Sequence, residues 1–319
     1  ADVNFQKDDE IVDIIKKVFK NFDKRIDYYY PSGDICLDDG TRVNAVLPSL
    51  TQGGAAITIR KLSQNIGTID DLVKVGSLTS RVKDFLIAAV KLKLNILFSG
   101  GTGVGKTTLL KLLACHINDE ERIIVIEDAP ELHLGHPNSV SLQTRLPDEN
   151  GKGEVDLRYL IRNAMRMRPD RIILGEIRGQ EALDTLQAMS TGHRGTLAII
   201  HGSSSRGAIA RLETLAKFSG VDVPTEEIKK LISSTIDIVV HIVQLRDGSR
   251  RIINVSEVRG IERGAIAMQD IYTFRTEGVD DKGRIKGKLC SSFKMFPAFF
   301  KEMEKQGFVT TDVFKEDNA

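Results

Sequence analysis

The stretch "NILFSGGTGVGKTTLLKLLACHI", residues 95–117, decides the fold of this chain. An apolar run that predicts a β-strand leads into a glycine-rich loop and then into an apolar stretch that predicts a helix. The loop fits the pattern G-x-x-x-x-G-K-[ST], in which glycines let the backbone aim its N–H groups at phosphate oxygens. A strand before and a helix after are the context that this phosphate loop requires. We therefore predict a nucleotide site here.

The predicted contacts to ATP or ADP come from one continuous run of residues. Lys106 is expected to reach the β- and γ-phosphates, and the hydroxyl of Thr107 to take one position around Mg²⁺. The nucleotide-binding residues are Gly100, Gly101, Thr102, Gly103, Val104, Gly105, Lys106, Thr107 and Thr108.

Strands and helices alternate on both sides of this loop, which favours a parallel sheet. Predicted strands are "RIIVIED", "RIILGE" and "GTLAIIHG", and predicted helices include "DLRYLIRNAMRMR" and "QEALDTLQAMS". Two further helices, two strands around the Asp247-Gly248 turn and a short last helix follow. The fold class is therefore α/β, a RecA-like P-loop ATPase domain with a smaller α+β domain before it.

The first 60 residues differ in pattern from the rest. "DEIVDIIKKVFKNF" has helical apolar spacing, "GDICLDDGTRVNAVLPSL" reads as a hairpin around Asp39-Gly40, and "AAITIRKL" reads as a further strand. We predict an N-terminal domain over residues 1–66, a polar linker over 67–76, and the ATPase domain with its C-terminal strands and helix over 77–319. The chain opens without Met, so we expect the N-terminal domain to be truncated at its start.

Bulk composition narrows the class of protein. Of 319 residues, 41% are hydrophobic and 28% charged, which is ordinary for a globular protein. A formal net charge of +1 gives no electrostatic reason to expect nucleic acid as a partner. Three cysteines without metal spacing favour a reducing compartment, the cytoplasm, and no apolar run approaches the ~18 residues of a membrane span.

Acidic residues follow two of the predicted strands. Glu127, Asp128 and Glu131, in "IVIEDAPELHL", come where the strand beside the phosphate loop should end. Three carboxylates there suit magnesium binding, water orientation or proton transfer. An acidic solvated loop is the structural alternative.

The stretch "RPDRIILGEIRG" poses a question, because an ATPase strand of this kind usually ends in a magnesium-binding aspartate. Here Gly175 and Glu176 follow the apolar run. Glu176 has one more methylene and can reach the magnesium shell from one residue further on. Alternatively, Glu176 activates the attacking water while Glu131 or Asp128 serves the metal.

Histidines and arginines supply further candidates. His201 ends a predicted strand at the same edge and is a candidate to sense the γ-phosphate or to link the site to the next subunit, whereas a loop histidine such as His193 is as readily structural. Transition-state charge on phosphate rewards an added guanidinium. For Arg60 and Arg145, surface solvation or a salt bridge is nevertheless the better interpretation from the residues alone, and only the family resemblance below makes them candidates. The arginines of "DLRYLIRNAMRMR" lack interleaved aromatics and are interpreted as packing near phosphates or at a subunit interface.

Four motifs in order resemble the secretion ATPase superfamily of type II and type IV secretion systems and type IV pili. They are "GGTGVGKTT", "IEDAPEL", "RMRPDRIILGEIRG" and "STGHRGTLAIIHG". The chain is most similar to the CpaF/TadA-type motor ATPases of tight-adherence (Flp) pili. In that group the third motif normally ends in Gly-Glu, so Gly175 is no defect. One departure is "GSS" after His201, where relatives more often carry Ala-Asn.

The resemblance implies a homo-hexameric ring of two-domain subunits at the inner face of the cytoplasmic membrane. The ring would act on an inner-membrane platform protein, and through it on pilin. By resemblance, Glu131 and Glu176 are the acids for water activation and magnesium, Arg60 is an N-terminal arginine that approaches the phosphates, and Arg145 is a similar basic residue. The alternatives are a VirB11-like traffic ATPase of a type IV secretion system, a RecA-class nucleic-acid motor and a nucleotide-binding scaffold without hydrolysis.

Overall fold

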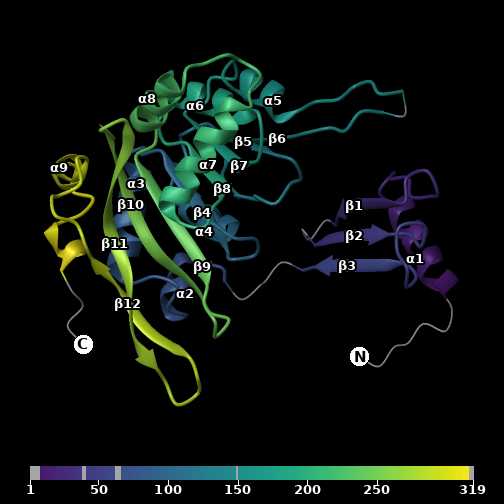
Figure 1. The fold of residues 1–319 in the computed structure, drawn as a ribbon, viewed down its shortest axis with the longest axis horizontal. Helices are drawn as coiled ribbons and strands as arrows, with labels where there is room; N and C mark the ends of the chain where they lie inside the picture. Colours follow the sequence, from purple (N-terminus) through teal and green to yellow (C-terminus); the bar gives the residue numbers. More distant parts are fainter. Residues whose placement is uncertain (1–7, 38–40, 62–65, 149, 316–319) are drawn as a thin grey trace. The chain divides into compact units, whose positions relative to one another are not determined.

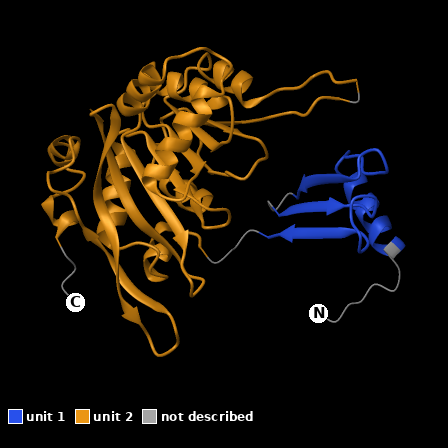
Figure 2. Ribbon diagram, in the orientation of Figure 1, with its two compact units in different colours: residues 1–65 blue, residues 66–319 orange. Residues whose placement is uncertain are grey.

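The structure is a computed structural model that describes residues 8–37, 41–61, 66–148 and 150–315. Two compact units, residues 1–65 and 66–319, divide the chain (Figure 2). Both units mix helices and strands, and the second contains a large sheet with a parallel and an antiparallel part (Figure 1). The α/β class predicted from the sequence is confirmed.

The first unit is one helix packed on a three-stranded antiparallel sheet. Its elements are α1 (Asp8–Lys20), β1 (Ser32–Cys36), β2 (Arg42–Val46) and β3 (Ala56–Arg60), in the sheet order β1-β2-β3. Ile15 and Phe19 of α1 share a buried core with Ile35, Val43 and Ala45 of the sheet. The predicted hairpin is therefore present as β1 and β2, and its Asp39-Gly40 turn lies outside the described residues.

The second unit is built on a nine-stranded sheet of order β12-β11-β10-β9-β4-β8-β7-β5-β6. From β9 to β6 all neighbours are parallel, and β10, β11 and β12 continue the sheet antiparallel. The strands are β4 (Ile96–Gly100), β5 (Ile123–Glu127), β6 (Ser139–Gln143), β7 (Arg171–Ile177), β8 (Leu197–His201), β9 (Ile238–Gln244), β10 (Arg250–Glu262), β11 (Ala265–Val279) and β12 (Ile285–Ser291).

Helices cover both faces of the parallel strands. Phe98 of β4 points into the core that contains residues of α3 and α4, and its neighbour Leu97 into the core that contains residues of α5 to α8. Burial on both faces explains why these strands read as continuous apolar runs. The helices are α2 (Ile69–Lys74), α3 (Ser80–Lys91), α4 (Lys106–Ala114), α5 (Leu157–Ala164), α6 (Glu181–Ser190), α7 (Ser205–Lys217), α8 (Thr225–Thr235), α9 (Phe300–Lys305) and the 3₁₀ turn η1 (Thr311–Phe314). Within the described part of the chain, no helix has the length and apolarity needed to cross a bilayer.

Some of these elements differ from the sequence expectation. Residues 67–76, expected as a linker, contain α2, whose start is fixed by a reciprocal capping box between Thr68 and Asp71. Ile69 buries its side chain, and the segment belongs to the second unit. Strands β6, β11 and β12 were not predicted, because they bury few side chains. No residue of β6 is fully buried, β11 buries only Ile271 and Tyr272, and β12 buries only Leu289 and Cys290.

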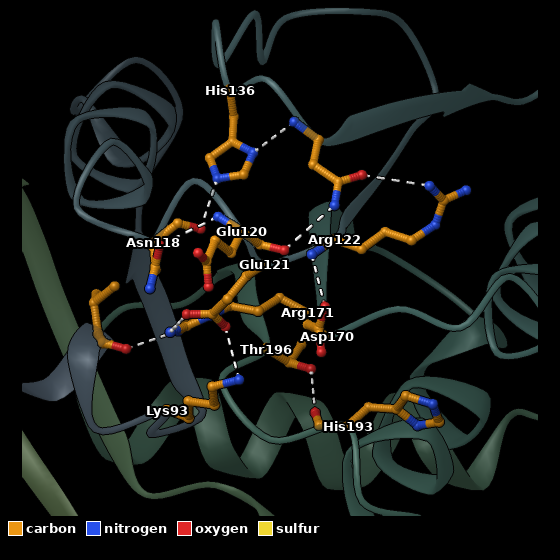
Figure 3. A network of polar contacts seen from close by, with 12 residues as sticks. Lys93, Asn118, Glu120, Glu121, Arg122, His136, Asp170, Arg171, His193 and Thr196 are labelled. Atoms are coloured by element: carbon orange, nitrogen blue, oxygen red, sulfur yellow. Dashed lines mark hydrogen bonds and ion pairs between the residues drawn. The ribbon is translucent and has the colours of Figure 1, made fainter.

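A polar network closes the amino ends of the parallel strands (Figure 3). Arg171, at the start of β7, is wholly buried and bonds both carboxylate oxygens of Glu121, at 2.8 and 3.0 Å. Its third bond goes to the carbonyl of Val90, and Lys93 also pairs with Glu121. Burial alone would raise the pKa of Glu121, but the bonds with Arg171 and Lys93 outweigh burial and hold that pKa below its usual range.

This buried pair gives a stability prediction. Replacing Arg171 by Met should lower the free energy of unfolding by about 3–5 kcal/mol, because the carboxylate of Glu121 then stays buried without its main partner. Urea unfolding monitored by circular dichroism measures the change. Lys230→Met, which removes an exposed pair with Glu227, is the control and should shift stability by less than about 0.5 kcal/mol. Equal effects of the two substitutions would contradict the role of Arg171.

Candidate active site

The phosphate loop connects the end of β4 to the start of α4, and its first glycine has no room for a side chain. Gly100 has φ +152°, and a Cβ atom there would lie 2.3 Å from the carbonyl oxygen of Ile242 on β9. Gly103 and Gly105 also have positive φ, +74° and +100°. The glycines of the motif therefore meet real steric requirements of the backbone.

Lys106 begins α4 and is almost entirely buried. Its ammonium donates hydrogen bonds to the carbonyls of Gly100 and Gly101, at 3.1 and 2.6 Å, so its charge lies over the loop. No side chain caps the amino end of α4, where Gly105 is the N-cap. The first-turn N–H groups and the Lys106 charge together make this loop a place for anionic phosphate.

Glu127, at the end of β5, serves the backbone. Its side chain is buried, and its carboxylate accepts hydrogen bonds from the main-chain N–H groups of Glu131 and Leu132, at 3.0 to 3.2 Å. These bonds fix the turn that presents the remaining two acids. Of the three carboxylates that the sequence offered as a group, Glu127 therefore holds the segment, while Asp128 is exposed and Glu131 partly buried.

Gly175 is explained by the same acid. A Cβ atom at position 175 would lie 2.8 Å from Cγ of Glu127, closer than real Cβ contacts allow. An aspartate at this position would collide with the buried Glu127. The missing carboxylate therefore reflects a steric requirement of the neighbouring strand.

Glu176 is displaced by a bulge in β7. Between the pairs Leu174–Ala198 and Ile177–Ile200, β7 has two residues where β8 has one. Such a bulge re-aims a side chain at the end of a strand. The carboxylate of Glu176 lies 2.7 Å from Nε2 of His201 through one oxygen and accepts a bond of 2.7 Å from Arg178 through the other.

A cluster of charged and polar side chains lies beside the phosphate loop. Its members are Glu176, His201, Arg178 and Asp128. His201 of β8 is the register partner of Gly100, the last residue of β4, so the imidazole comes from the strand next to the loop. Arg178 also lies 3.7 Å from Asp128, which joins the end of β5 to the cluster. The described residues therefore bring Lys106, Glu176, His201 and Asp128 to the carboxyl edge of neighbouring parallel strands.

Arg178 was not singled out from the sequence. Its guanidinium bridges Glu176 and Asp128, and the pKa of Arg178 is raised, chiefly by the bond to Glu176. The available signal was its position in "GEIRG", two residues after the glutamate. In a strand that spacing places two side chains on the same face.

His201 is a weak base in this setting. Partial burial lowers its pKa, the charge of Lys106 lowers it further, and Glu176 opposes the shift. The neutral imidazole is then the main form at pH 7, and it donates Nε2–H to the carboxylate of Glu176.

Other predicted residues lie apart from this cluster. The His193 ring bonds the carbonyl of Ala188 in the preceding helix α6, which fits the structural alternative. Arg145 is exposed, and its guanidinium donates a hydrogen bond to the carbonyl of Gly153. Both residues belong to the segment between β6 and α5. This segment was expected to be a loop, but in it Arg145 and Val155 form an isolated antiparallel β-bridge. Arg60 is an exposed residue of β3 in the first unit.

The arginines of α5 mainly serve packing inside the chain. Arg158 and Arg162 both pair with the buried Asp184 of α6, at 2.8 and 2.9 Å. These bonds tie two neighbouring helices together. Our interpretation of them as residues near phosphates or an interface is therefore not needed to explain their presence.

Magnesium prefers oxygen ligands and is usually bound by one or two side chains together with substrate phosphates. The Thr107 hydroxyl and the carboxylates of Glu176 and Asp128 are oxygen donors of this kind. No cluster of three or more His, Cys, Asp or Glu side chains that would suit a metal occurs among the described residues. The donor set therefore fits a metal held jointly with phosphate.

Comparison with known proteins shows the family of the chain. The family model described as type II/IV secretion system protein matches residues 23–286. The chain belongs to this family. A putative conjugal transfer protein of Mycobacterium tuberculosis is 35% identical over 221 residues, which cover 69% of this chain and 62% of that protein. The type IV secretion system protein VirB11 of Bartonella quintana is 33% identical, over 73% of this chain and 75% of that protein.

A solved structure supports the fold of this type II/IV secretion system protein. The ATPase DotB of Legionella pneumophila superposes with a TM-score of 0.54 at 20% identity, over 82% of this chain and 71% of that one. At this identity the likeness supports the fold alone. The chain spans 62% of the length of its mycobacterial relative.

Gly175→Ala tests the packing at the centre of the site. The added methyl should force Glu127 out of place and release the turn that carries Asp128 and Glu131, so the free energy of unfolding should fall by about 1–3 kcal/mol. Urea unfolding monitored by circular dichroism measures the change. Gly53→Ala changes a glycine that has open space around it and, like Gly175, no positive φ, and serves as the control. Parent-like stability of Gly175→Ala would contradict the packing described here.

His201 should titrate below the ordinary histidine range. As pH falls, the unfolded chain takes up the proton near its usual pKa of about 6.5 while the folded chain resists it, so His201 lowers stability progressively on the acid side. Removing the opposing carboxylate with Glu176→Gln should depress the pKa of His201 further. Imidazole NMR titration measures both values, with Glu227→Gln on α8 as a remote control. A rise in the pKa on removing Glu176 would refute this account.

Proposed function

We propose that this chain is an ATP-hydrolysing motor subunit of a type II/IV secretion-family machine. The observation that carries the proposal is the convergence of Lys106 and the Glu176–His201–Arg178 cluster on the carboxyl ends of the neighbouring strands β4, β8 and β7. A phosphate loop beside hydrogen-bonded acids suits phosphoryl transfer to water. A scaffold that only bound nucleotide would not need the acids.

Each residue of the site is assigned a role according to the part of the bound ATP, metal or water that it contacts. Lys106 and the N–H groups of the loop hold the phosphates, and Thr107 with Glu176 or Asp128 holds Mg²⁺, which when bound neutralises charge on the β- and γ-phosphates. Glu176 or Glu131 orients and deprotonates the attacking water. His201, as a neutral donor, fixes the carboxylate of Glu176 and responds to the phosphate near it.

We also propose that the subunits form a hexameric ring. Arg60 and Arg145 are exposed cations that would supply positive charge to the phosphates in such an assembly. The ring would work at the inner face of the cytoplasmic membrane on a platform protein, and so move its cargo indirectly. The formal net charge of +1 favours protein over nucleic acid as the direct partner.

Two machines are candidates for this motor. The named relatives, a conjugal transfer protein and VirB11, favour a traffic ATPase of a type IV secretion system. The residues "LRDGSRRIINVSEV", which form the turn after β9 and most of β10, favour the tight-adherence pilus motor. A chromosomal Lys106→Ala allele separates the two: loss of surface pili supports the pilus motor, and loss of DNA or protein transfer with pili intact supports the traffic ATPase.

Glu176→Gln tests the catalytic proposal. The variant should bind Mg·ATP within a few-fold of the parent and lose at least about 10²-fold in single-turnover hydrolysis, the usual size of a general-base effect. Glu262→Gln, at the far end of β10, is the matched control. Recovery of turnover at excess magnesium would assign Glu176 to the metal and Glu131 to the water. Undiminished hydrolysis at every magnesium concentration would sink the proposal.

A further inference from the structure

The turn between β9 and β10 stands beside the phosphate loop and has no assigned role. Strand β9 runs parallel to β4 and pairs Ile242 with Gly100, so both strands end at the same edge. The chain then turns around Asp247-Gly248 and starts β10 at Arg250, which is the register partner of Gln244. On the side of β4 away from β8, the next strand of the sheet is β9, and this turn continues directly from it.

Arg250 lies against the loop itself. Its Cδ atom is 3.9 Å from the position of a Cβ atom on Gly105, the residue just before Lys106. The main chain of Arg250 is held in place, because its carbonyl accepts a bond of 2.7 Å from the Ser77 hydroxyl. The stem of this arginine therefore packs on the backbone that cradles phosphate.

The guanidinium of Arg250 is available to a ligand. It is exposed, and within residues 8–37, 41–61, 66–148 and 150–315 it makes no hydrogen bond or ion pair. Its neighbour Arg251 is different: that guanidinium bonds the carbonyls of Gly76 and Ile285 and stacks over Phe274. Arg251 therefore has a structural role, whereas the positive charge of Arg250 lies beside a loop suited to bind anions.

Strand order indicates which phosphates Arg250 can meet. Glu176, His201 and Asp128 come from β7, β8 and β5, all on one side of β4, whereas β9 and β10 lie on the other side. The phosphate that reacts with water must lie near the acids. Arg250 therefore faces the part of the polyphosphate that is nearer the nucleoside.

We propose that Arg250 binds the α- and β-phosphates of the nucleotide held by the loop of its own subunit. This inference rests on the proposed function, since it takes the loop to be an ATP site. Arg250 would add a second cation to Lys106 and would bind ATP and ADP alike, because both carry these phosphates. Its charge-assisted bond would then retain the nucleotide throughout the cycle.

Titration calorimetry with Mg·ATP, Mg·ADP and magnesium pyrophosphate tests the inference on the full chain. Arg250→Gln and Arg250→Met should each weaken all three ligands by about tenfold, the effect of losing one charge-assisted bond, and Arg250→Lys should restore part of the affinity. The control is Arg246→Gln, an exposed arginine of the same turn, which should bind like the parent.

Three results would overturn the inference: unchanged affinity in both neutral variants, weakening of ATP alone, or weakening of ADP with pyrophosphate unaffected. The second would place Arg250 at the γ-phosphate, and the third at the nucleoside. Lys106→Ala separates this inference from the proposed function. If Lys106→Ala abolishes nucleotide binding and the Arg250 variants do not weaken it, only the inference fails; if Lys106→Ala also binds like the parent, the ATP site itself fails.

Discussion

The close packing of Glu127 against Gly175 is the contact on which the candidate site depends. Because position 175 has no side chain, Glu127 stays buried between β5 and β7 and bonds the N–H groups of Glu131 and Leu132. The turn after β5 is thereby fixed, and the acid that the neighbouring strand would otherwise carry moves one residue on, to Glu176. Position 175, where such a strand usually carries an aspartate, has no room for a side chain beside Glu127. The nearest acid on β7 is therefore Glu176, and the bulge directs its carboxylate toward His201 and Arg178.

The two edges of the parallel sheet have opposite character. At the amino edge, Arg171 donates hydrogen bonds to both carboxylate oxygens of Glu121. This pair fixes the start of β7 relative to the residues that precede β5. At the carboxyl edge, a bound phosphate can replace the present partners of Lys106 and Arg178, and a metal can replace Arg178 as the partner of the carboxylates of Glu176 and Asp128. A site that binds and releases charged ligands is expected to combine a fixed scaffold with side chains that can change partners. The scaffold then holds the reacting groups in position while their hydrogen bonds change.

Local sequence patterns were enough to predict most of the fold and part of the candidate site. The phosphate loop, the buried strands β4, β5, β7 and β8 and their helices could be predicted, because burial on both faces gives long apolar runs and the loop has a strict glycine spacing. Strands β11 and β12 could not, since β11 is held by pairing with β10 and β12 by pairing with β11, and both bury few side chains. The packing of Glu127 against Gly175 and the contact of Arg178 with Asp128 were also out of reach. Both join segments that lie far apart in the sequence, and no spacing along the chain encodes them.

The central proposal is that Glu127 braces the turn while Glu176 serves the metal or the attacking water. The most direct measurement is a cryo-electron microscopy structure of the assembled protein with Mg²⁺ and a non-hydrolysable ATP analogue. The account predicts that Glu127 keeps its bonds to the N–H groups of Glu131 and Leu132, and that the carboxylate of Glu176 contacts Mg²⁺ or the water in line with the γ-phosphate. A structure in which Glu127 leaves those N–H groups to bind the metal, with Glu176 remote from metal and water, would contradict it.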